Sequence, residues 1–500
     1  MKKLAIIDIG SNSMRVLIVK IMNGRNYQFV DELKSIVRLG RNMTADGAIS
    51  EEKIRLAIIA LSHFKRLCDS NDVTEIVAVA TEAVRKASNQ REFIDRAKKE
   101  IGIDIRVLSG DEEAYFDYLA VVNSIDVKSA LLMDIGGSST EFILVKNRKL
   151  KECISIPMGA ITLTDKFLSI KGNNQKRIKE LEAFLVSNFD KIGWLKEASG
   201  MSLIGIGGSH RTIGKIHRNK INYPFNNPHN YIISSRDVID IYNFLKNMGI
   251  SQYKKVRGIS RDRADIFVGA ICCIATVIKY CNTKKLCISE SGLRQGLLYG
   301  KLIEGYPPLV ENILDFSLNN IMNNYNLDKD HLKLVWGFAK KLCAVFSDML
   351  SMKDEDYRIL KSAVMLSECG ISLGFGSQEN YSFYIVRNLK IYGLTHREQI
   401  MTAFVVSNFE EGKIKKTDYF GKILNCSDIE MIKKLSLVFY ISRSLDRAYD
   451  GNVVDIDIEI EKEKVILNIV SKKESLLEMG MIDDCKDYFY KVFNKVLVVK

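Results

Sequence analysis

The N-terminal part of the chain alternates short apolar runs with longer amphipathic stretches. Residues 76–80 and 103–108 are compact runs of the kind that form buried strands. Residues 51–68 instead place apolar side chains at three- and four-residue spacing, which predicts a helix, and 174–192 repeats this spacing. Strands that alternate with helices predict an α/β fold.

One stretch of this pattern occurs twice, because Ile6–Ser13 is matched 126 positions later by Leu132–Ser139. In each copy an apolar run ends in an aspartate, Asp8 or Asp134, a Gly/Ser turn follows, and a second apolar run leaves. This predicts a strand, a tight loop and a returning strand. Glycine lets the backbone approach a ligand, and small hydroxyl residues add donors, so such a loop suits phosphate. Two copies predict two related halves that share a cleft.

A third glycine-rich segment, Gly205–Ser209, follows the apolar pair Leu203–Ile204 and is interpreted as another loop of this kind. Its neighbours His210 and Arg211 are residue types that could face an anion. A single Gly/Asp turn is common in hairpins and would not by itself indicate phosphate binding. The interpretation of these turns as phosphate loops therefore depends on their repetition. The basic segment 253–263 is either a solvated surface or the approach for a long anion.

From about Leu302 onward the pattern becomes helical and contains no glycine-rich loop of the phosphate type. Helices are expected over 332–350, 357–366 and 397–407, a hairpin over 453–470, and one more helix over 475–493. The predicted domains are 1–125, 126–301, 302–446 and 447–500.

Composition narrows the class of partner without choosing one. The net charge of +12 favours polyanions, whether nucleic acid, an acidic membrane surface or a phosphate-rich substrate. Ten cysteines without a CxxC pair are typical of reduced thiols in a cytoplasmic protein and make a zinc site improbable. The longest weakly polar run, 266–278, is too short to span a bilayer. A cytoplasmic protein without a membrane anchor is expected.

Eight blocks along the chain now identify a family resemblance. They are DIGSNSMR (8–15), ATEAVRKASN (80–89), LSGDEEA (108–114), DIGGSSTE (134–141), IPMGAITLT (156–164), GIGGSHRTI (205–213), RADI (263–266) and SGLRQG (291–296). In this order they resemble the exopolyphosphatase and guanosine pentaphosphate phosphatase (Ppx/GppA) family. The resemblance implies an α/β fold class, with two actin/sugar-kinase-like (ribonuclease H-like) domains followed by an all-α HD-like domain and a small α+β C-terminal domain.

The resemblance also implies the roles of individual residues. Glu113 is the expected catalytic glutamate. The local sequence gives Glu112 another role: Ser109 is predicted to cap the next helix, and an acidic residue in the first turn is favoured by the helix dipole. The expected ligands of Mg²⁺, or of another divalent cation, are Asp8, Asp134 and Glu141; K⁺ is a second candidate ion. The expected phosphate-binding residues are Arg85, Arg263, Gly10, Ser11, Asn12, Ser13, Gly136, Gly137, Ser138, Ser139, Gly207, Gly208 and Ser209.

Three departures from the family pattern bear on function. Ser138 stands where the family has a third consecutive glycine, and Gln295 where it often has glutamate. The block 363–370 lacks the histidine of an HD hydrolase centre, and the downstream block 379–385 lacks one as well. An HD centre needs these histidines as metal ligands, so this domain is predicted to be a scaffold for dimerisation or for holding a polyanion.

The leading hypothesis is an exopolyphosphatase that releases terminal orthophosphate from inorganic polyphosphate, with Glu113 acting on water. The alternatives are a 5′-phosphohydrolase of guanosine pentaphosphate, a polyphosphate- or nucleotide-binding regulator with weakened turnover, and a sugar or acetate kinase. Polyphosphate or guanosine pentaphosphate is the expected partner, with no nucleic acid, no membrane and a homodimer.

Overall fold

The computed structural model describes the chain apart from residues 1, 23–24, 42, 45, 169–173, 249, 375 and 408–417. The chain forms two compact units, Met1–Ile313 and Leu314–Lys500, and each is described by itself.

The first sheet of unit 1 has the strand order β3-β2-β1-β4-β5. It is formed by β1 (Lys2–Ile9), β2 (Met14–Ile21), β3 (Tyr27–Ser35), β4 (Glu75–Ala80) and β5 (Ile105–Val107). Strand β1 pairs antiparallel with β2 and parallel with β4, which places it at the centre of the sheet. Helix α1 (Glu51–Ser70) covers one face, where its Leu61 and Phe64 are fully buried. Burying such a side chain contributes roughly 1.5–3 kcal/mol of transfer free energy.

The second sheet repeats this topology with the order β10-β11-β9-β6-β7-β8. Its strands are β6 (Ala130–Ile135), β7 (Thr140–Lys146), β8 (Lys149–Ile156), β9 (Leu203–Ile206), β10 (Tyr231–Ser234) and β11 (Lys285–Ile288). Strand β6 pairs antiparallel with β7 and parallel with β9, as β1 does with β2 and β4. The predicted duplication of the two halves is therefore confirmed in the order and direction of the strands.

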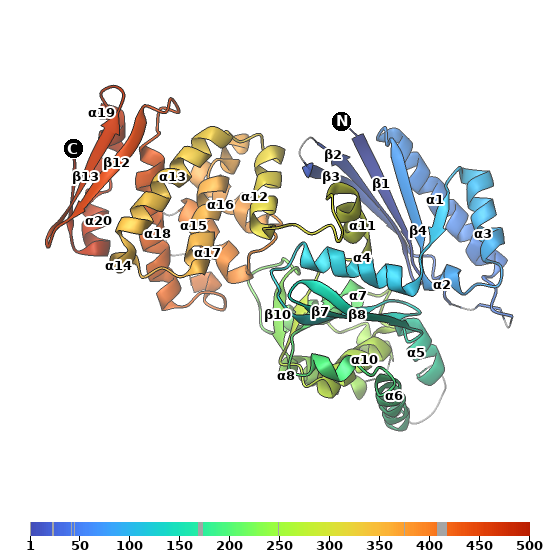
Figure 1. The fold of residues 1–500 in the computed structure, drawn as a ribbon. Coiled ribbons are helices and arrows are strands. Elements are labelled where there is room, and N and C mark those ends of the chain that lie inside the picture. The colour runs from blue at the N-terminus through green and yellow to red at the C-terminus, as the bar shows by residue number, and fades with distance from the viewer. Residues whose placement is uncertain are drawn as a thin grey trace. The chain divides into compact units, whose positions relative to one another are not determined.

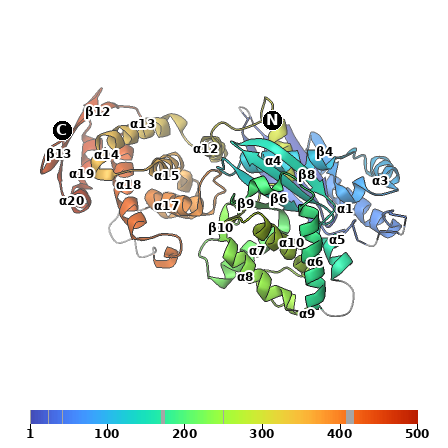
Figure 2. The same cartoon turned by 60° about the horizontal axis from the view of Figure 1, so that its bottom comes forward.

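Side chains along β6 alternate between two helical layers, as the period of a strand requires. Leu131 and Met133 pack in one core, which includes residues of α5 (Ala160–Phe167), α6 (Asn174–Phe189) and α10 (Phe267–Tyr280). Leu132, from the same strand, packs in the other core. That core includes Tyr118 and Leu119 of α4 (Gly110–Val122). Figures 1 and 2 show α4 on one side of this sheet and α5, α6 and α10 on the other.

Shorter elements complete unit 1. They are α2 (Glu82–Arg85), α3 (Gln90–Arg96), a π-helical turn (Ala97–Ile101), a 3₁₀ turn (Leu195–Ala198), α7 (Gly207–Lys220), α8 (Ser235–Lys246), α9 (Ile250–Tyr253), α11 (Leu293–Leu302) and α12 (Ile313–Asn324), whose first residue closes the unit. Helix α11 packs against α4 and β1, and thus links the two sheets on one side.

Unit 2 begins with a helical part. Its elements are the rest of α12, α13 (Lys329–Val345), α14 (Ser347–Leu350), α15 (Asp354–Leu366), a 3₁₀ turn (Cys369–Leu373), α16 (Gln378–Asn388), α17 (His396–Ser407), a 3₁₀ turn (Asp418–Phe420) and α18 (Cys426–Ser444). The predicted helices over 357–366 and 397–407 correspond to α15 and α17, whereas the predicted helix over 332–350 is divided into α13 and α14. Assignment of this part to an HD-like domain stays a prediction, as do the four domain boundaries and the homodimer.

The chain ends in a small sheet with the order β12-β13-β14. Its strands are β12 (Val453–Ile460), β13 (Lys464–Ser471) and β14 (Val496–Val499), and the first two form the predicted hairpin. The predicted single helix over 475–493 is wrong, because α19 (Leu476–Asp483) and α20 (Lys486–Phe493) are separate helices.

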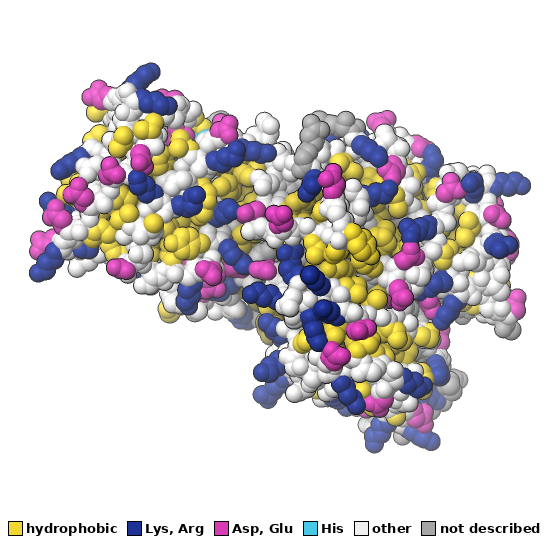
Figure 3. All heavy atoms as spheres, viewed as in Figure 1, with side chains coloured by type: hydrophobic (Ala, Val, Ile, Leu, Met, Phe, Trp, Pro, Cys, Tyr) yellow, Lys and Arg dark blue, Asp and Glu magenta, His cyan; other side chains and the backbone are white. Residues whose placement is uncertain are grey.

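Three further features concern the helices, the cysteines and the surface. Within the described residues, no helix combines the length and apolar character needed to cross a membrane. All ten cysteines lie in the described part and are unbridged, as the sequence predicts. On the face shown in Figure 3, Lys and Arg side chains are interspersed with Asp and Glu rather than gathered in one stripe.

Candidate active site

The two duplicated hairpins have the same local geometry. In the first, Asp8 pairs with Arg15 across the strands, and the Gly10 N–H donates to Ser13 O at 3.2 Å. In the second, Asp134 pairs with Glu141. There the Gly136 N–H donates to Ser139 O at 3.0 Å. The predicted strand, tight loop and returning strand are confirmed in both copies.

Neighbouring segments hold the carbonyl groups of both loops. Gly40 N–H donates to Ser11 O at 2.9 Å, and Arg38 N–H donates to Asn12 O at 3.0 Å. In the second loop, the start of α5 plays this part: Ala160 N–H donates to Gly136 O at 3.0 Å, and Ile161 N–H donates to Gly137 O at 2.8 Å. These hydrogen bonds hold both loops in place. The loop groups that are not engaged in them lie along a shared cleft.

The tips of the two hairpins meet. A Cβ atom added to Gly137 would lie 2.9 Å from Ser11 Cβ and 3.3 Å from the Asn12 nitrogen, so only glycine fits. The Ser138 side chain lies against Gly40, because a Cβ atom added to Gly40 would lie 2.6 Å from Ser138 Oγ. Ser138 does not line the cleft, and its side chain therefore does not obstruct a ligand there.

Strand β9 runs directly into α7 at the mouth of the same cleft. The predicted third loop over Gly205–Ser209 is wrong in this respect, because α7 begins at Gly207. Glycine is required at position 207, whose φ is +82° and where an added Cβ would collide with Asp134 Oδ1. One on Gly208 would lie 2.1 Å from Arg263 Cζ. The N-terminus of α7 is a favourable position for an anion, since its first N–H groups and the helix dipole attract negative charge.

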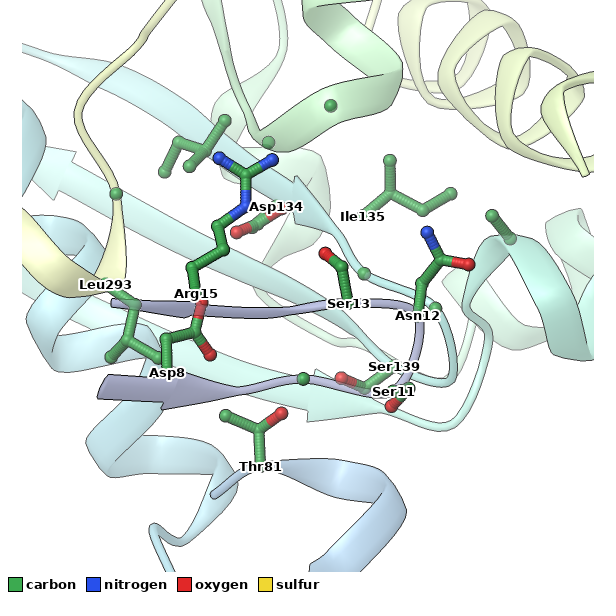
Figure 4. Close-up of a pocket in the computed structure, with 18 of the residues that line it drawn as sticks. Asp8, Ser11, Asn12, Ser13, Arg15, Thr81, Asp134, Ile135, Ser139 and Leu293 are labelled. Atoms are coloured by element: carbon green, nitrogen blue, oxygen red, sulfur yellow. The ribbon is translucent and has the colours of Figure 1, made fainter. Parts of the chain in front are cut away.

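Four arginines line this cleft of about 160 Å³, namely Arg15, Arg211, Arg263 and Arg294. Figure 4 shows Arg15 reaching from β2 toward the region of Asp134. Burial, followed by repulsion from Arg15 and Arg263, lowers the pKa of Arg211 to about 10. Burial also lowers the pKa of Arg263, as does its neighbour Arg15. Cations that repel one another in a buried cleft would be stabilised by a polyanion.

Carboxylates occupy the adjoining wall. Asp8, Glu113 and Asp134 line the cleft, whereas Glu141 lies behind it and accepts a hydrogen bond from Ser155 Oγ at 2.7 Å. Burial raises the pKa of Asp134 to about 6, against the opposing effect of Arg211. Burial and then Asp134 raise the pKa of Glu141 to about 7. This wall carries more negative charge than its surroundings stabilise.

Glu113 is held at the first turn of α4. Ser109 caps that helix, as predicted, and the structure shows in addition that it forms a capping box with Glu112. Arg85 Nη1 lies 3.3 Å from Glu113 Oε2 and donates to Leu108 O at 2.6 Å. Its Nη2 contacts Glu82 Oε2 at 2.5 Å. Burial and then Glu141 raise the pKa of Glu113 well above its usual value, whereas Arg85 opposes that rise.

The acidic wall fits the predicted divalent cation in its chemistry. Mg²⁺ prefers oxygen ligands and usually takes one or two carboxylates together with substrate phosphates. Asp8 and Asp134 are available on the cleft wall. In the described part of the chain, no three Asp, Glu, His or Cys side chains converge to enclose a metal ion by themselves. The cation would therefore depend on substrate oxygens as well.

Most of the predicted site residues lie together. Those that line the cleft are Asp8, Gly10, Ser11, Asn12, Ser13, Glu113, Asp134, Gly136, Gly137, Ser139, Gly207, Gly208 and Arg263. Arg85, Ser138, Glu141 and Ser209 are not among the lining residues. Sequence reasoning assigned no role to Arg15 or Arg294. For Arg15 a signal existed, because cross-strand partners such as Asp8 and Arg15 point to the same face of a sheet.

In unit 2, Glu368 of the block that lacks the HD histidine contacts the buried His331 and the more exposed Tyr449. His331 Nδ1 lies 2.7 Å from Asp446 Oδ2, and its Nε2 lies 3.5 Å from Glu368 Oε1. The His331 ring stacks on Tyr449 at 3.9 Å, and the Tyr449 hydroxyl donates to Glu368. These groups satisfy one another, and the scaffold role of this part of the chain stays a prediction.

Fold and site together define an α/β protein with an arginine-lined cleft between two related lobes. A profile of the Ppx/GppA phosphatase family matches residues 17–304, and a profile of Ppx/GppA phosphatase domain III matches residues 313–484. The chain belongs to the Ppx/GppA phosphatase family.

Two solved structures of this family are similar to the chain. An exopolyphosphatase from Cytophaga hutchinsonii shares 28% identity with a TM-score of 0.57, covering 60% of this chain and 98% of its own. The Ppx/GppA family member from Aquifex aeolicus shares 29% identity with a TM-score of 0.51, covering 59% of this chain and 96% of its own. These likenesses, with the repeated sheet topology, fit the α/β part of the predicted fold class.

Proposed function

We propose that this protein is an exopolyphosphatase, which hydrolyses the terminal phosphoanhydride bond of inorganic polyphosphate. One observation carries the proposal: the glycine loops, the arginines and the buried carboxylate of Glu113 line a single cleft. A phosphoanhydride resists attack by water because its oxygens repel a nucleophile. Arg15, Arg211 and Arg263 would neutralise that charge, which is the largest contribution a protein makes to phosphoryl transfer.

In the proposed reaction, a water oxygen bonds to the terminal phosphorus while the bridging P–O bond breaks. Glu113 accepts the proton of that water, and the shortened chain leaves with its new terminal oxygen. Arg85 fixes the Glu113 carboxylate and favours its ionised form. A divalent cation held at Asp8 and Asp134 would neutralise charge on the phosphoryl oxygens.

The composition of the cleft favours polyphosphate over guanosine pentaphosphate as the substrate. Among the described residues that line it, none is aromatic. A guanine base is commonly held by stacking on an aromatic ring, whereas a linear phosphate chain needs only cations and N–H donors. The similar protein from Cytophaga hutchinsonii is an exopolyphosphatase.

Orthophosphate release tests the proposal directly. Purified protein with Mg²⁺ should release orthophosphate from long-chain polyphosphate with a higher kcat/KM than from guanosine pentaphosphate. Orthophosphate release from guanosine pentaphosphate alone would identify guanosine pentaphosphate, and not polyphosphate, as the substrate. Tight binding of polyphosphate with no release, even at high protein concentration, would instead define a binding protein and overturn the proposal.

A further inference from the structure

Asp117 lies one helical turn after Glu113 on α4, and none of its surface is exposed. Its carboxyl group is within hydrogen-bonding reach of Asp134. A Cβ atom added to Gly292, which lines the cleft, would lie 3.5 Å from Asp117 Oδ1. The Asp117 side chain therefore lies immediately behind the cleft wall, beside the carboxylate expected to hold a cation.

Neither oxygen of Asp117 receives a hydrogen bond from any described residue. After burial, the groups that act most strongly on its pKa are neighbouring carboxylates, Asp134 first. The other carboxylates of this wall each have a favourable neighbour. These neighbours are Arg294 for Asp8, Arg85 for Glu113, Arg211 for Asp134 and Ser155 for Glu141.

A buried carboxylate without a donor or a counter-charge is costly, and a structural role would normally supply one or the other. Here α4 directs a second acidic group at Asp134, and burial together with repulsion between the two raises the pKa of Asp117 well above its usual value. A divalent cation at Asp134 would reverse the sign of this interaction, because both carboxylates would then face a positive charge.

We infer that Asp117 is a positioning residue for divalent-cation binding, which acts from behind Asp134 and adds negative charge to the cation side of the cleft. The inference deepens the proposed function, on whose cation it rests. Groups behind a metal ligand commonly change metal affinity 10–100-fold when they are replaced.

The test measures cation binding without substrate. Mn²⁺ is titrated into the full chain and into Asp117→Asn, and free Mn²⁺ is followed by electron paramagnetic resonance. The Kd for Mn²⁺ should rise roughly 10–100-fold in the variant. The melting temperature without cation should be unchanged or higher, because the amide replaces a buried acidic group and can donate to Asp134. Binding of orthophosphate without cation should be unchanged, since the arginines are intact.

Two results would overturn the inference. One is a parental Kd for Mn²⁺ in Asp117→Asn, and the other is a parallel loss of Mn²⁺ and orthophosphate binding, which would indicate a distorted cleft. Asp117→Ser, with a smaller side chain, provides a second variant if the asparagine does not fold, and the same results apply to it. No polyphosphate is used in this test. An unchanged Kd for Mn²⁺ would therefore overturn the role of Asp117 and leave the proposed hydrolysis untouched. Conversely, a protein that does not hydrolyse polyphosphate could still show the Mn²⁺ result.

Discussion

Arg85 and Glu113 form a close pair, with Arg85 Nη1 at 3.3 Å from Glu113 Oε2 and both side chains mostly buried. The same guanidinium also contacts Glu82 and the Leu108 carbonyl. Arg85 is thus held on three sides and does not line the cleft. Its geometry favours orienting Glu113, whereas the sequence predicted a phosphate ligand.

Replacement of Arg85 should separate these two roles. In Arg85→Ala, Glu113 loses its buried partner, and we expect kcat for orthophosphate release to fall roughly 10–100-fold with a smaller change in KM. A phosphate ligand would instead raise KM strongly. Lys86→Ala is the matched control, because Lys86 also pairs with Glu82 but is more than half exposed, and its kcat should stay near that of the parent.

Gly208 leaves room for the Arg263 guanidinium at the start of α7. In Gly208→Ala the methyl group would displace that guanidinium, and the affinity for phosphate chains should fall about tenfold, as expected for loss of one charge-assisted contact. Calorimetric titration with short polyphosphate measures this change. Gly193→Ala is the control, since nothing lies within 4 Å of its added Cβ. Equal affinity in both variants would show that Arg263 does not contact the ligand.

His210 makes the stability of unit 1 depend on pH. Burial lowers the pKa of its imidazole from 6.5 to about 4, and Nδ1 lies 2.6 Å from the Ile206 carbonyl. Because the folded state binds fewer protons than the unfolded state, this contribution is present above pH 6.5 and is lost as pH falls toward 4. The loss amounts to about 3 kcal/mol.

The variant His210→Asn should therefore lose less stability than the parent between pH 7 and pH 4. Urea unfolding at several pH values measures the free energy of unfolding for both proteins. His63→Asn, at an exposed position on α1, serves as the control. The same pH dependence in His210→Asn and the parent would show that the imidazole is accessible to protons in the folded state.

The hairpin loops and the α4 cap could be predicted because their signals are local. An aspartate, a Gly/Ser turn and two flanking apolar runs specify the strand, loop and strand within about a dozen residues. Ser109 and Glu112 likewise form the capping box from a four-residue pattern. Repetition of the hairpin then indicated two equivalent halves, which the two sheets bear out.

The misassigned features depend on distant contacts. Gly207 and Gly208 suggested a loop because glycine disfavours helices, yet here they open α7 to make room for Asp134 and Arg263. Arg85 meets Glu113 only because β4 and β5 are adjacent in the sheet. Asp117 could have been placed beside Glu113 from its four-residue spacing, but its contact with Asp134 requires the folded packing of α4.

The rate of orthophosphate release by Glu113→Gln is the most direct test of the proposed chemistry. The isosteric amide cannot accept the proton of water, so turnover of polyphosphate should fall roughly 10²–10⁴-fold while polyphosphate binding persists. Glu112→Gln is the matched control, because Glu112 only caps α4 and pairs with Arg106, and its rate should stay close to the parental one. Turnover by Glu113→Gln at the parental rate would contradict the role of Glu113 as the base.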